Sequence, residues 1–179
     1  TVTGVAVGTV RPPQEVNGDP VIDVAISRIA STKTGMERLS ELRRRILATV
    51  ETSPPDLVII EGYSFNSKDS HAHALGELGG VVKLTLFERG YVFVDAPPAS
   101  LKLYASGRGN APKALVLTDA VRRLGFAGSD NNEADALWLL AMGLDWLGHP
   151  LVAMPDHNRQ GLGKIPWPDG LRPLNAEQG

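Results

Sequence analysis

Two acidic side chains stand out because each interrupts or follows a run of apolar residues. Glu61 follows the apolar run at residues 57–60, and Asp135 lies within the apolar segment over residues 134–147. A carboxylate in such a place is costly to bury unless a cation pairs with it. Mg²⁺ takes oxygen ligands and keeps several waters, so few protein carboxylates suffice. Phosphodiester hydrolysis typically uses two such ions about 3.5–4 Å apart. The pattern therefore indicates a divalent-cation site assembled from distant segments.

Each acidic segment also has a purely structural explanation. Glu61 could emerge into solvent where its strand stops. Asp130, Asn132 and Glu133 are residue types that cap helix N-termini, and capping alone explains them well. Asp135 sits too far inside the same helix to cap it. For Glu61, emergence into solvent and a role as a metal ligand both remain open, whereas the position of Asp135 favours a role as a ligand.

A basic, glycine-rich segment is the third feature that could carry chemistry. Lys102, Arg108 and Lys113 surround a turn that contains Gly107 and Gly109. The glycines permit a close approach of the backbone, so main-chain amides and cationic side chains can converge on a phosphate. A plain surface turn is the alternative, unless the segment lies beside the carboxylates.

An α/β arrangement is needed to position these residues. Residues 1–10 and 21–30 are β-branched or alternating and flank a Pro/Asn/Gly-rich turn, which predicts an antiparallel hairpin. Residues 57–60 form a continuous apolar run, which predicts a strand covered on both faces, and residues 91–96 form a further compact strand. Helices are expected over residues 36–50, 72–89, 114–124 and 133–147, with a short helix from Ser100. Strands followed by strand-helix alternation predict a hairpin joined to parallel strands.

Two of the expected helices carry unusual residues. Arg38, Arg43, Arg44 and Arg45 lie mostly off the apolar stripe of the first, and we expect them on its solvated face, with a phosphate contact as the alternative. The helix over residues 72–89 contains three glycines, whose small size would let it lie close to the sheet despite their low helix propensity.

The composition fits one sizeable globular domain, since the chain has 179 residues, of which 42% are hydrophobic and 21% charged. We assign it to residues 1–149, with an N-terminal strand that we expect to be incomplete. Residues 150–179 are rich in Pro and Gly, and we expect a tail that is extended or disordered unless it finds a surface. The absence of cysteine fits a reducing cytoplasm, and no apolar segment is long enough for a membrane. A net charge of −2 still allows nucleic-acid binding through a local patch.

In their order along the chain, these features resemble the RuvC family of Holliday-junction resolvases, a branch of the RNase H-like nucleases, and most of all its divergent phage members. The likeness runs from TVTGVAV to ALWLLAM. It comprises TGVAV, VIIEGYSFNSK with the following LGELGG, LKLYASGRGNAPKALVLTDAVRRLG and NNEADALWL. No single segment is specific, but the ordered set is.

The resemblance implies roles for the acidic and basic residues. Glu61 matches the acidic residue at the end of the family's central strand, and Asp135 matches the last Asp of its C-terminal acidic motif. Lys102 and Lys113 match two lysines near the scissile phosphate. In the family an aromatic residue after the strand glutamate stacks at the junction centre; that position falls between Tyr63 and Phe65, either of which we expect to serve. The full set of DNA contacts expected is Tyr63, Phe65, Asn66, Lys68, Lys102, Arg108 and Lys113.

The chain departs from the family pattern at two places. Asn132 occupies the position of a ligand three residues before the last Asp, where its amide oxygen would be a weaker ligand than a carboxylate. Asp130 is the alternative ligand. The family's first catalytic Asp lies on a strand just upstream of TVTGVAV, and no residue of this sequence corresponds to it.

The resemblance implies an RNase H-like α/β fold, with a mixed central sheet, an antiparallel hairpin edge and helices on both faces. The implied activity is two-metal hydrolysis of Holliday junctions or other branched DNA by a homodimer, with Mg²⁺ as cofactor and Mn²⁺ able to replace it. The helix over residues 72–89 is the candidate dimer face. We expect no membrane partner and a role in DNA recombination and repair in the cytoplasm of a bacterium or a phage-infected host. The alternatives are an RNase H-like nuclease with broader DNA or RNA substrates and a catalytically impaired junction-binding module.

Overall fold

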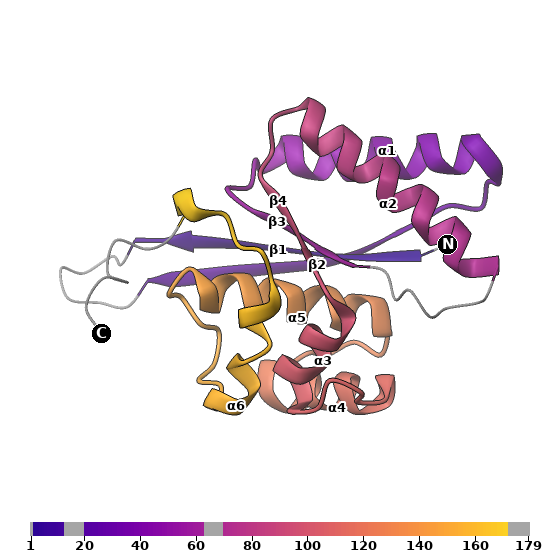
Figure 1. The fold of residues 1–179 in the computed structure, drawn as a ribbon. Coiled ribbons are helices and arrows are strands. Elements are labelled where there is room, and N and C mark those ends of the chain that lie inside the picture. Colours follow the sequence, from indigo (N-terminus) through magenta and orange to yellow (C-terminus); the bar gives the residue numbers. More distant parts are fainter. Residues whose placement is uncertain (1, 13–19, 63–69, 172–179) are drawn as a thin grey trace.

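The computed structural model describes residues 2–12, 20–62 and 70–171 (Figure 1). Every strand and helix expected from the sequence is present, with small shifts at the ends. None of the helices in these ranges combines the length and the hydrophobicity that a bilayer span requires. The elements in chain order are β1 (Val2–Arg11), β2 (Val21–Ala30), α1 (Gly35–Thr52), β3 (Val58–Glu61), α2 (Ser70–Glu88), β4 (Phe93–Ala96), α3 (Pro98–Ser106), α4 (Lys113–Leu124), α5 (Asn131–Trp146), α6 (Asp156–Arg159) and the 3₁₀ turns η1 (Leu162–Lys164) and η2 (Asp169–Leu171).

The strands pair in two sets. β1 and β2 form the expected antiparallel hairpin, and β3 pairs in parallel with β4, with Glu61 opposite Ala96. Among the described residues these pairs are separate two-stranded sheets, not the single hydrogen-bonded sheet expected from the sequence. β3 therefore pairs along one edge, and the apolar residues of this strand are half-buried, where coverage of both faces was expected.

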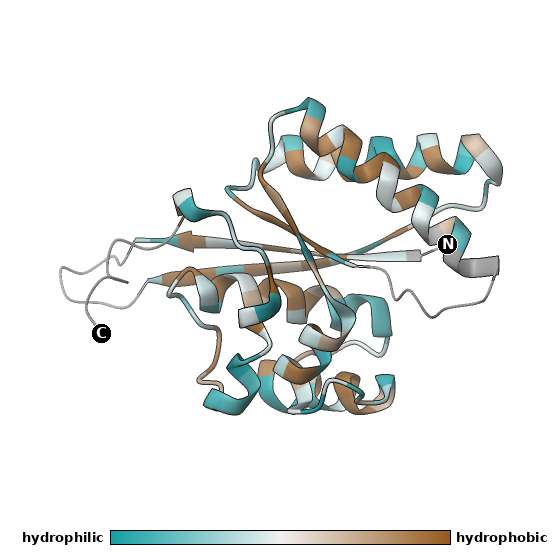
Figure 2. Cartoon of the chain, viewed as in Figure 1, coloured by the Kyte–Doolittle hydropathy of each residue, from teal (hydrophilic) through white to brown (hydrophobic). Residues whose placement is uncertain are grey.

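Helices cover both faces of the strands, as expected. In Figure 1, α1 and α2 lie on one side of the strands, and α3, α4 and α5 lie on the other. In Figure 2, hydrophobic residues run along much of the strands, whereas hydrophobic and hydrophilic residues alternate along α1 and α2. α5 contacts β1, β2 and β3 and thereby links the two sheets.

Two glycines of β1 let α5 lie directly on the strand. Gly4 and Gly8 are four residues apart and so share one face of β1. A Cβ at Gly4 would overlap the main-chain carbonyl of Asn132, and one at Gly8 would lie 2.8 Å from the Cδ1 atom of Leu140. The first turn of α5 is therefore placed by its contact with the β1 backbone.

The apolar core lies on both sides of the strands. One cluster joins β4 to α3, α4 and α5, and the second joins α1 and α2 to the hairpin. The most buried large side chains of the first are Leu101, Tyr104, Val116, Trp138 and Met142, and the second contains Ile29, Leu39, Leu42 and Leu78. The first cluster holds in place the elements that surround the candidate site.

One expectation for α1 was wrong, and the expectation for the glycines of α2 is not met at two of the three. Arg38 is not on a solvated face: it is 7% exposed, and its guanidinium donates to the Ala74 carbonyl at 3.4 Å and to Glu77 at 3.5 Å. The packing of α1 against α2 encloses the arginine stem. Gly76 and Gly80 do not approach the sheet, because nothing lies within 4 Å of a Cβ at either position.

The Pro/Gly-rich segment after α5 is folded as far as Leu171, where an extended or disordered tail was one of the expected outcomes. It forms α6, η1 and η2, and Met154, Leu162 and Ile165 are buried in the same cluster as α3 and α5. Trp167 stacks on Trp146 with ring centroids 4.8 Å apart. The short helical turns were not expected from the composition. Prolines and glycines exclude long helices and strands, but they still allow single helical turns.

Candidate active site

Glu61 is positioned by the parallel pairing of β3 with β4. It is the last residue of β3 and lies opposite Ala96, the last residue of β4. Pro97 and Pro98 end β4 and begin α3, since proline has no amide hydrogen for a ladder while its fixed φ suits a first helical turn. The chain therefore enters α3 beside Glu61, and Lys102 follows in the second turn.

Asp135 is positioned by the start of α5. The Oδ1 atom of Asp130 accepts hydrogen bonds from the amides of Asn132 at 2.8 Å and Glu133 at 3.2 Å, so Asp130 is the N-cap. α5 then begins at Asn131, and its contact with β1 fixes its first turn. Asp135 lies in the second turn between two buried alanines.

Four of the residues selected from the sequence share one electrostatic environment. Burial, and after it the charge of Asp135, raises the pKa of Glu61 to about 7, while Lys113 and Lys102 lower it. Burial also raises the pKa of Asp135, against the same two lysines. Glu61 is exposed at the end of β3 and Asp135 is half-buried, so the pKa of Glu61 is raised by the protein packed around its carboxylate and not by enclosure of the whole side chain. The structure thus brings together Glu61, Asp135, Lys102 and Lys113.

This donor set fits a hard divalent cation. Glu61 and Asp135 offer carboxylate oxygens as ligands, and a cation between them would relieve both the desolvation and the effect of the Asp135 charge on Glu61. Among the residues that the structure describes, no group of three or more His, Cys, Asp or Glu side chains could hold a metal ion. Waters and substrate oxygens would therefore supply most of the remaining coordination.

The two candidates for a third ligand lie in different settings. Asp130 is committed elsewhere: its Oδ1 caps α5, and its Oδ2 faces the Arg28 guanidinium at 3.5 Å. Desolvation raises the pKa of Asp130, but hydrogen bonds from the Glu133 and Asn132 amides, the Asn132 side chain and Arg28 together lower it. Asn132 is exposed in the first turn of α5, and its main-chain carbonyl lies against Gly4. The Asn132 side chain also donates a hydrogen bond to Asp130, which leaves its amide oxygen for a ligand.

The basic loop (residues 107–112) is a tight connection between α3 and α4. Gly107 ends α3 in the left-handed conformation, with φ of 72°, and its amide donates to the Leu103 carbonyl at 2.8 Å. The Ala111 amide donates to the Arg108 carbonyl at 3.1 Å. Arg108 is exposed, and Lys113 begins α4 directly after the loop. The loop is therefore beside the carboxylates, as the phosphate-binding alternative requires.

Other expected DNA contacts are not placed. Tyr63, Phe65, Asn66 and Lys68 lie outside the described residues and stay predictions. The structure also shows two neighbours of the basic loop that the sequence did not reveal: His157 and Asn158 contact the carboxyl end of α3. Nothing in their Pro/Gly-rich surroundings marks them as partners of that helix.

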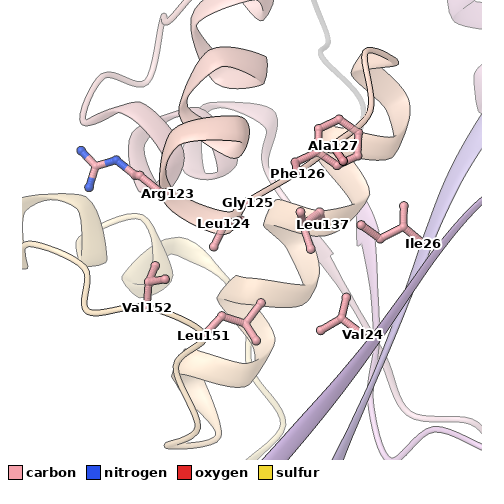
Figure 3. Close-up of a pocket in the computed structure, with 10 residues that line it drawn as sticks. All are labelled: Val24, Ile26, Arg123, Leu124, Gly125, Phe126, Ala127, Leu137, Leu151 and Val152. Carbon is pink, nitrogen blue, oxygen red and sulfur yellow. The ribbon is translucent and has the colours of Figure 1, made fainter.

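The best-defined cavity among the described residues is separate from this site. It has a volume of about 310 Å³ and lies between β2, the end of α4 and the segment after α5 (Figure 3). Its lining is apolar except for Arg123, and it includes neither carboxylate nor lysine of the candidate site.

The chain resembles curated proteins of one kind. None of the protein-family models compared with it matches. It is 31% identical over 104 residues to the crossover junction endodeoxyribonuclease RuvC of Synechococcus sp. (strain WH7803), covering 58% of this chain and 67% of that protein. It is 30% identical over 130 residues to the RuvC of Nocardioides sp. (strain ATCC BAA-499 / JS614), covering 72% of this chain and 73% of the relative.

Solved structures show the same architecture. Thermus thermophilus RuvC superposes with a TM-score of 0.57 at 21% identity, covering 86% of this chain and 94% of that one. T. thermophilus RuvC in complex with Holliday junction substrate gives a TM-score of 0.55 at 23% identity, covering 76% and 84%. These likenesses confirm the RNase H-like fold expected from the sequence. With the relatives above, they lead to one assignment: the chain belongs to the RuvC family of crossover junction endodeoxyribonucleases.

Proposed function

We propose that the chain is a structure-selective endonuclease that hydrolyses phosphodiester bonds in Holliday junctions or other branched DNA. The observation that carries the proposal is the shared site of Glu61, Asp135, Lys102 and Lys113, in which burial raises the pKa of both carboxylates and the charge of Asp135 raises that of Glu61 further. The substrate class is supported by the relatives, which are crossover junction endodeoxyribonucleases, and by the similar RuvC structure that binds a Holliday junction.

In this proposal Glu61 and Asp135 hold Mg²⁺, which Mn²⁺ can replace, and Asn132 adds its amide oxygen. Two bound cations would supply charge stabilisation and a water of lowered pKa. Lys102 and Lys113 donate hydrogen bonds to the scissile phosphate, where negative charge develops during cleavage. Arg108 and the amides of the basic loop bind a neighbouring phosphate and fix the register of the DNA.

A complete two-metal site needs a further carboxylate. The arrangement of the strands offers a place for it: β1 and β3 each pair on one edge within the described residues, and α5 packs across both. A strand between them would end beside Glu61, at the carboxyl edge of the sheet. An Asp on such a strand, as in the RuvC resemblance, would complete the set of ligands.

Two symmetric cuts in a four-way junction require a twofold dimer with one site in each subunit. We place the interface on α2. Leu84 and Phe87 are 57% and 74% exposed on this helix. Large apolar side chains exposed together on one helix are typical of an interaction surface.

The test uses the protein with its native N-terminus, a synthetic four-way junction and a linear duplex of the same sequence. With Mg²⁺ we expect paired nicks on the junction and none on the duplex, and no nicks with chelator. Binding is expected to weaken as salt rises, because phosphate contacts release counterions. Equal cleavage of the linear duplex or of RNA would replace the resolvase with a broader nuclease.

A catalytically impaired junction-binding module is the second candidate. It is favoured by the absence of a third acidic or imidazole ligand among the described residues. Junction binding that is tight in chelator, with no cleavage at any Mg²⁺ or Mn²⁺ concentration, would establish it.

A further inference from the structure

The segment after α5 makes a clasp (residues 155–165) that lies directly against α3. α6 and η1 contact that helix. The backbones approach closely at Gly161, where a Cβ would lie 2.6 Å from the Ser100 carbonyl oxygen. Leu162 and Ile165 anchor the clasp in the core. It therefore contacts α3 through its backbone as well as through side chains.

Two clasp side chains bond carbonyl oxygens at the carboxyl end of α3. The Nδ2 atom of Asn158 donates to the Tyr104 carbonyl at 2.7 Å, and the Nε2 atom of His157 donates to the Gly107 carbonyl at 2.9 Å. The last four carbonyls of a helix have no partner within it. Asn158 is only 5% exposed, so its amide has few alternatives to this bond. The clasp thus caps α3 from outside the helix.

The clasp is itself held in place. Arg159, next to Asn158, donates from Nη2 and Nε to Asp145 at 2.9 and 3.1 Å. The Tyr104 hydroxyl donates to the same carboxylate at 3.0 Å. α6 is therefore fixed to α5 while it caps α3, and Gly107 is held at the start of the basic loop.

We propose that Asn158 and His157 are positioning residues that set the basic loop, and with it Arg108 and Lys113, against the substrate phosphate. The loop is six residues long and begins at a carbonyl that His157 fixes. Lys113, whose charge acts on both Glu61 and Asp135, follows the loop directly as the first residue of α4. The catalytic part of this inference rests on the proposed function, whereas the structural part does not.

The structural part is tested without DNA, by amide hydrogen exchange of Gly107 and Ala111. Asn158→Leu and His157→Ala are expected to speed exchange at these amides about tenfold or more relative to the rest of the chain. His157→Gln, which keeps a donor, should restore much of the protection. Because His157 is exposed, its variants test the inference even if Asn158→Leu fails to fold. Ile29→Val, in the other core cluster, is the matched control for a small loss of stability. Unchanged exchange in the loop would overturn the inference.

The catalytic part is tested by kinetics on the four-way junction. His157→Ala and Asn158→Leu are expected to lower kcat by about tenfold to a hundredfold, with a smaller effect on KM, since misplaced groups lose transition-state contacts. In a Lys113→Ala background, the two clasp substitutions should lower kcat little further, because both act through Lys113. Losses that multiply would overturn the positioning role. If the wild-type protein cuts no junction, the proposed function fails, and the exchange measurement still decides whether the clasp orders the loop.

Discussion

The Asp135 carboxylate, in the second turn of α5, raises the pKa of the Glu61 carboxylate at the end of β3. Neither β3 nor α5 alone creates this relationship; it arises because α5 packs across both β1 and β3. Lys102 and Lys113 offset part of the repulsion, but burial outweighs them. The protein thus maintains two carboxylates that each hold a proton more tightly than usual, a condition that a divalent cation would relieve.

Removing the charge of Glu61 is expected to abolish cleavage. Glu61→Gln keeps the shape of the side chain but loses an anionic ligand, so Mg²⁺-dependent nicking of a four-way junction should fall at least about a hundredfold, more than the usual effect of residues that only support a ligand. Junction binding in chelator should persist. Glu51→Gln is the control, since this exposed glutamate pairs with Arg89 away from the site. Wild-type nicking in Glu61→Gln would contradict the assignment.

The raised pKa of Glu61 predicts that Mg²⁺ binding depends on pH. In the metal-free protein Glu61 should titrate near pH 7, so Mg²⁺ affinity rises with pH up to about 7 and then levels off. Asp135→Asn removes a cause of the raised pKa and should move the midpoint to lower pH. Carbon-detected NMR of the Glu61 carboxyl measures both values. A wild-type midpoint near the ordinary glutamate value of 4.5 would count against the coupling of Glu61 to Asp135.

The raised pKa of Glu61 also makes the stability of the protein depend on pH. The folded protein holds the Glu61 proton more tightly than the unfolded chain. The stability from this group is therefore fully present below pH 4.5 and is lost as pH rises to about 7. Urea unfolding of the metal-free protein should show this decline, and Mg²⁺ should restore stability above pH 7. A decline of the same size in Glu61→Gln would assign it to other groups.

The local pattern was sufficient for most of the fold and for part of the site. Glu61 and Asp135 could be chosen because each is a charge beside an apolar run, and the Asp130 cap follows from residue type alone. The burial of Arg38 could not be predicted, because it depends on where α2 packs against α1. The clasp could not either, because a Pro/Gly-rich composition describes which elements a segment cannot form and does not identify the surface that it covers.

The contact between β1 and α5 predicts a steric effect on the site. Gly4→Ala places a methyl group against the Asn132 main chain, and backbone cannot rotate away as a side chain can. We expect a loss of about 2 kcal/mol or more in the free energy of unfolding, with reduced nicking as the first turn of α5 shifts. Gly163→Ala is the control, since nothing lies within 4 Å of a Cβ there. Equal stabilities of the two variants would show that α5 does not rest on Gly4.

The exposed apolar residues of α2 predict the effect of a charge at the proposed dimer face. Leu84→Glu combined with Phe87→Glu should convert a dimer to a monomer in sedimentation equilibrium, and the monomer should stay folded because both side chains are largely exposed in the single chain. Paired junction nicks should become single, uncoupled nicks. Met36→Glu is the matched control, a residue 76% exposed on α1. A dimer that survives the double change would move the interface elsewhere.

The ion pair between Arg159 and Asp145 predicts how the clasp contributes to stability. The Asp145 side chain is 3% exposed, whereas that of Arg159 is 49% exposed, so Arg159→Met leaves a buried carboxylate with only the Tyr104 hydroxyl as partner. We expect a loss of about 3 kcal/mol, at the lower end for breaking a buried pair because solvent reaches one partner. Adding Asp145→Asn should recover part of that loss, since no unpaired charge remains and the new amide oxygen still accepts from Tyr104. Urea unfolding of the two single variants and the double variant measures this coupling, with exposed Arg122→Met as the control. If Asp145→Asn lowers the stability of the Arg159→Met protein as much as it lowers that of the wild-type protein, the two residues do not act as a pair.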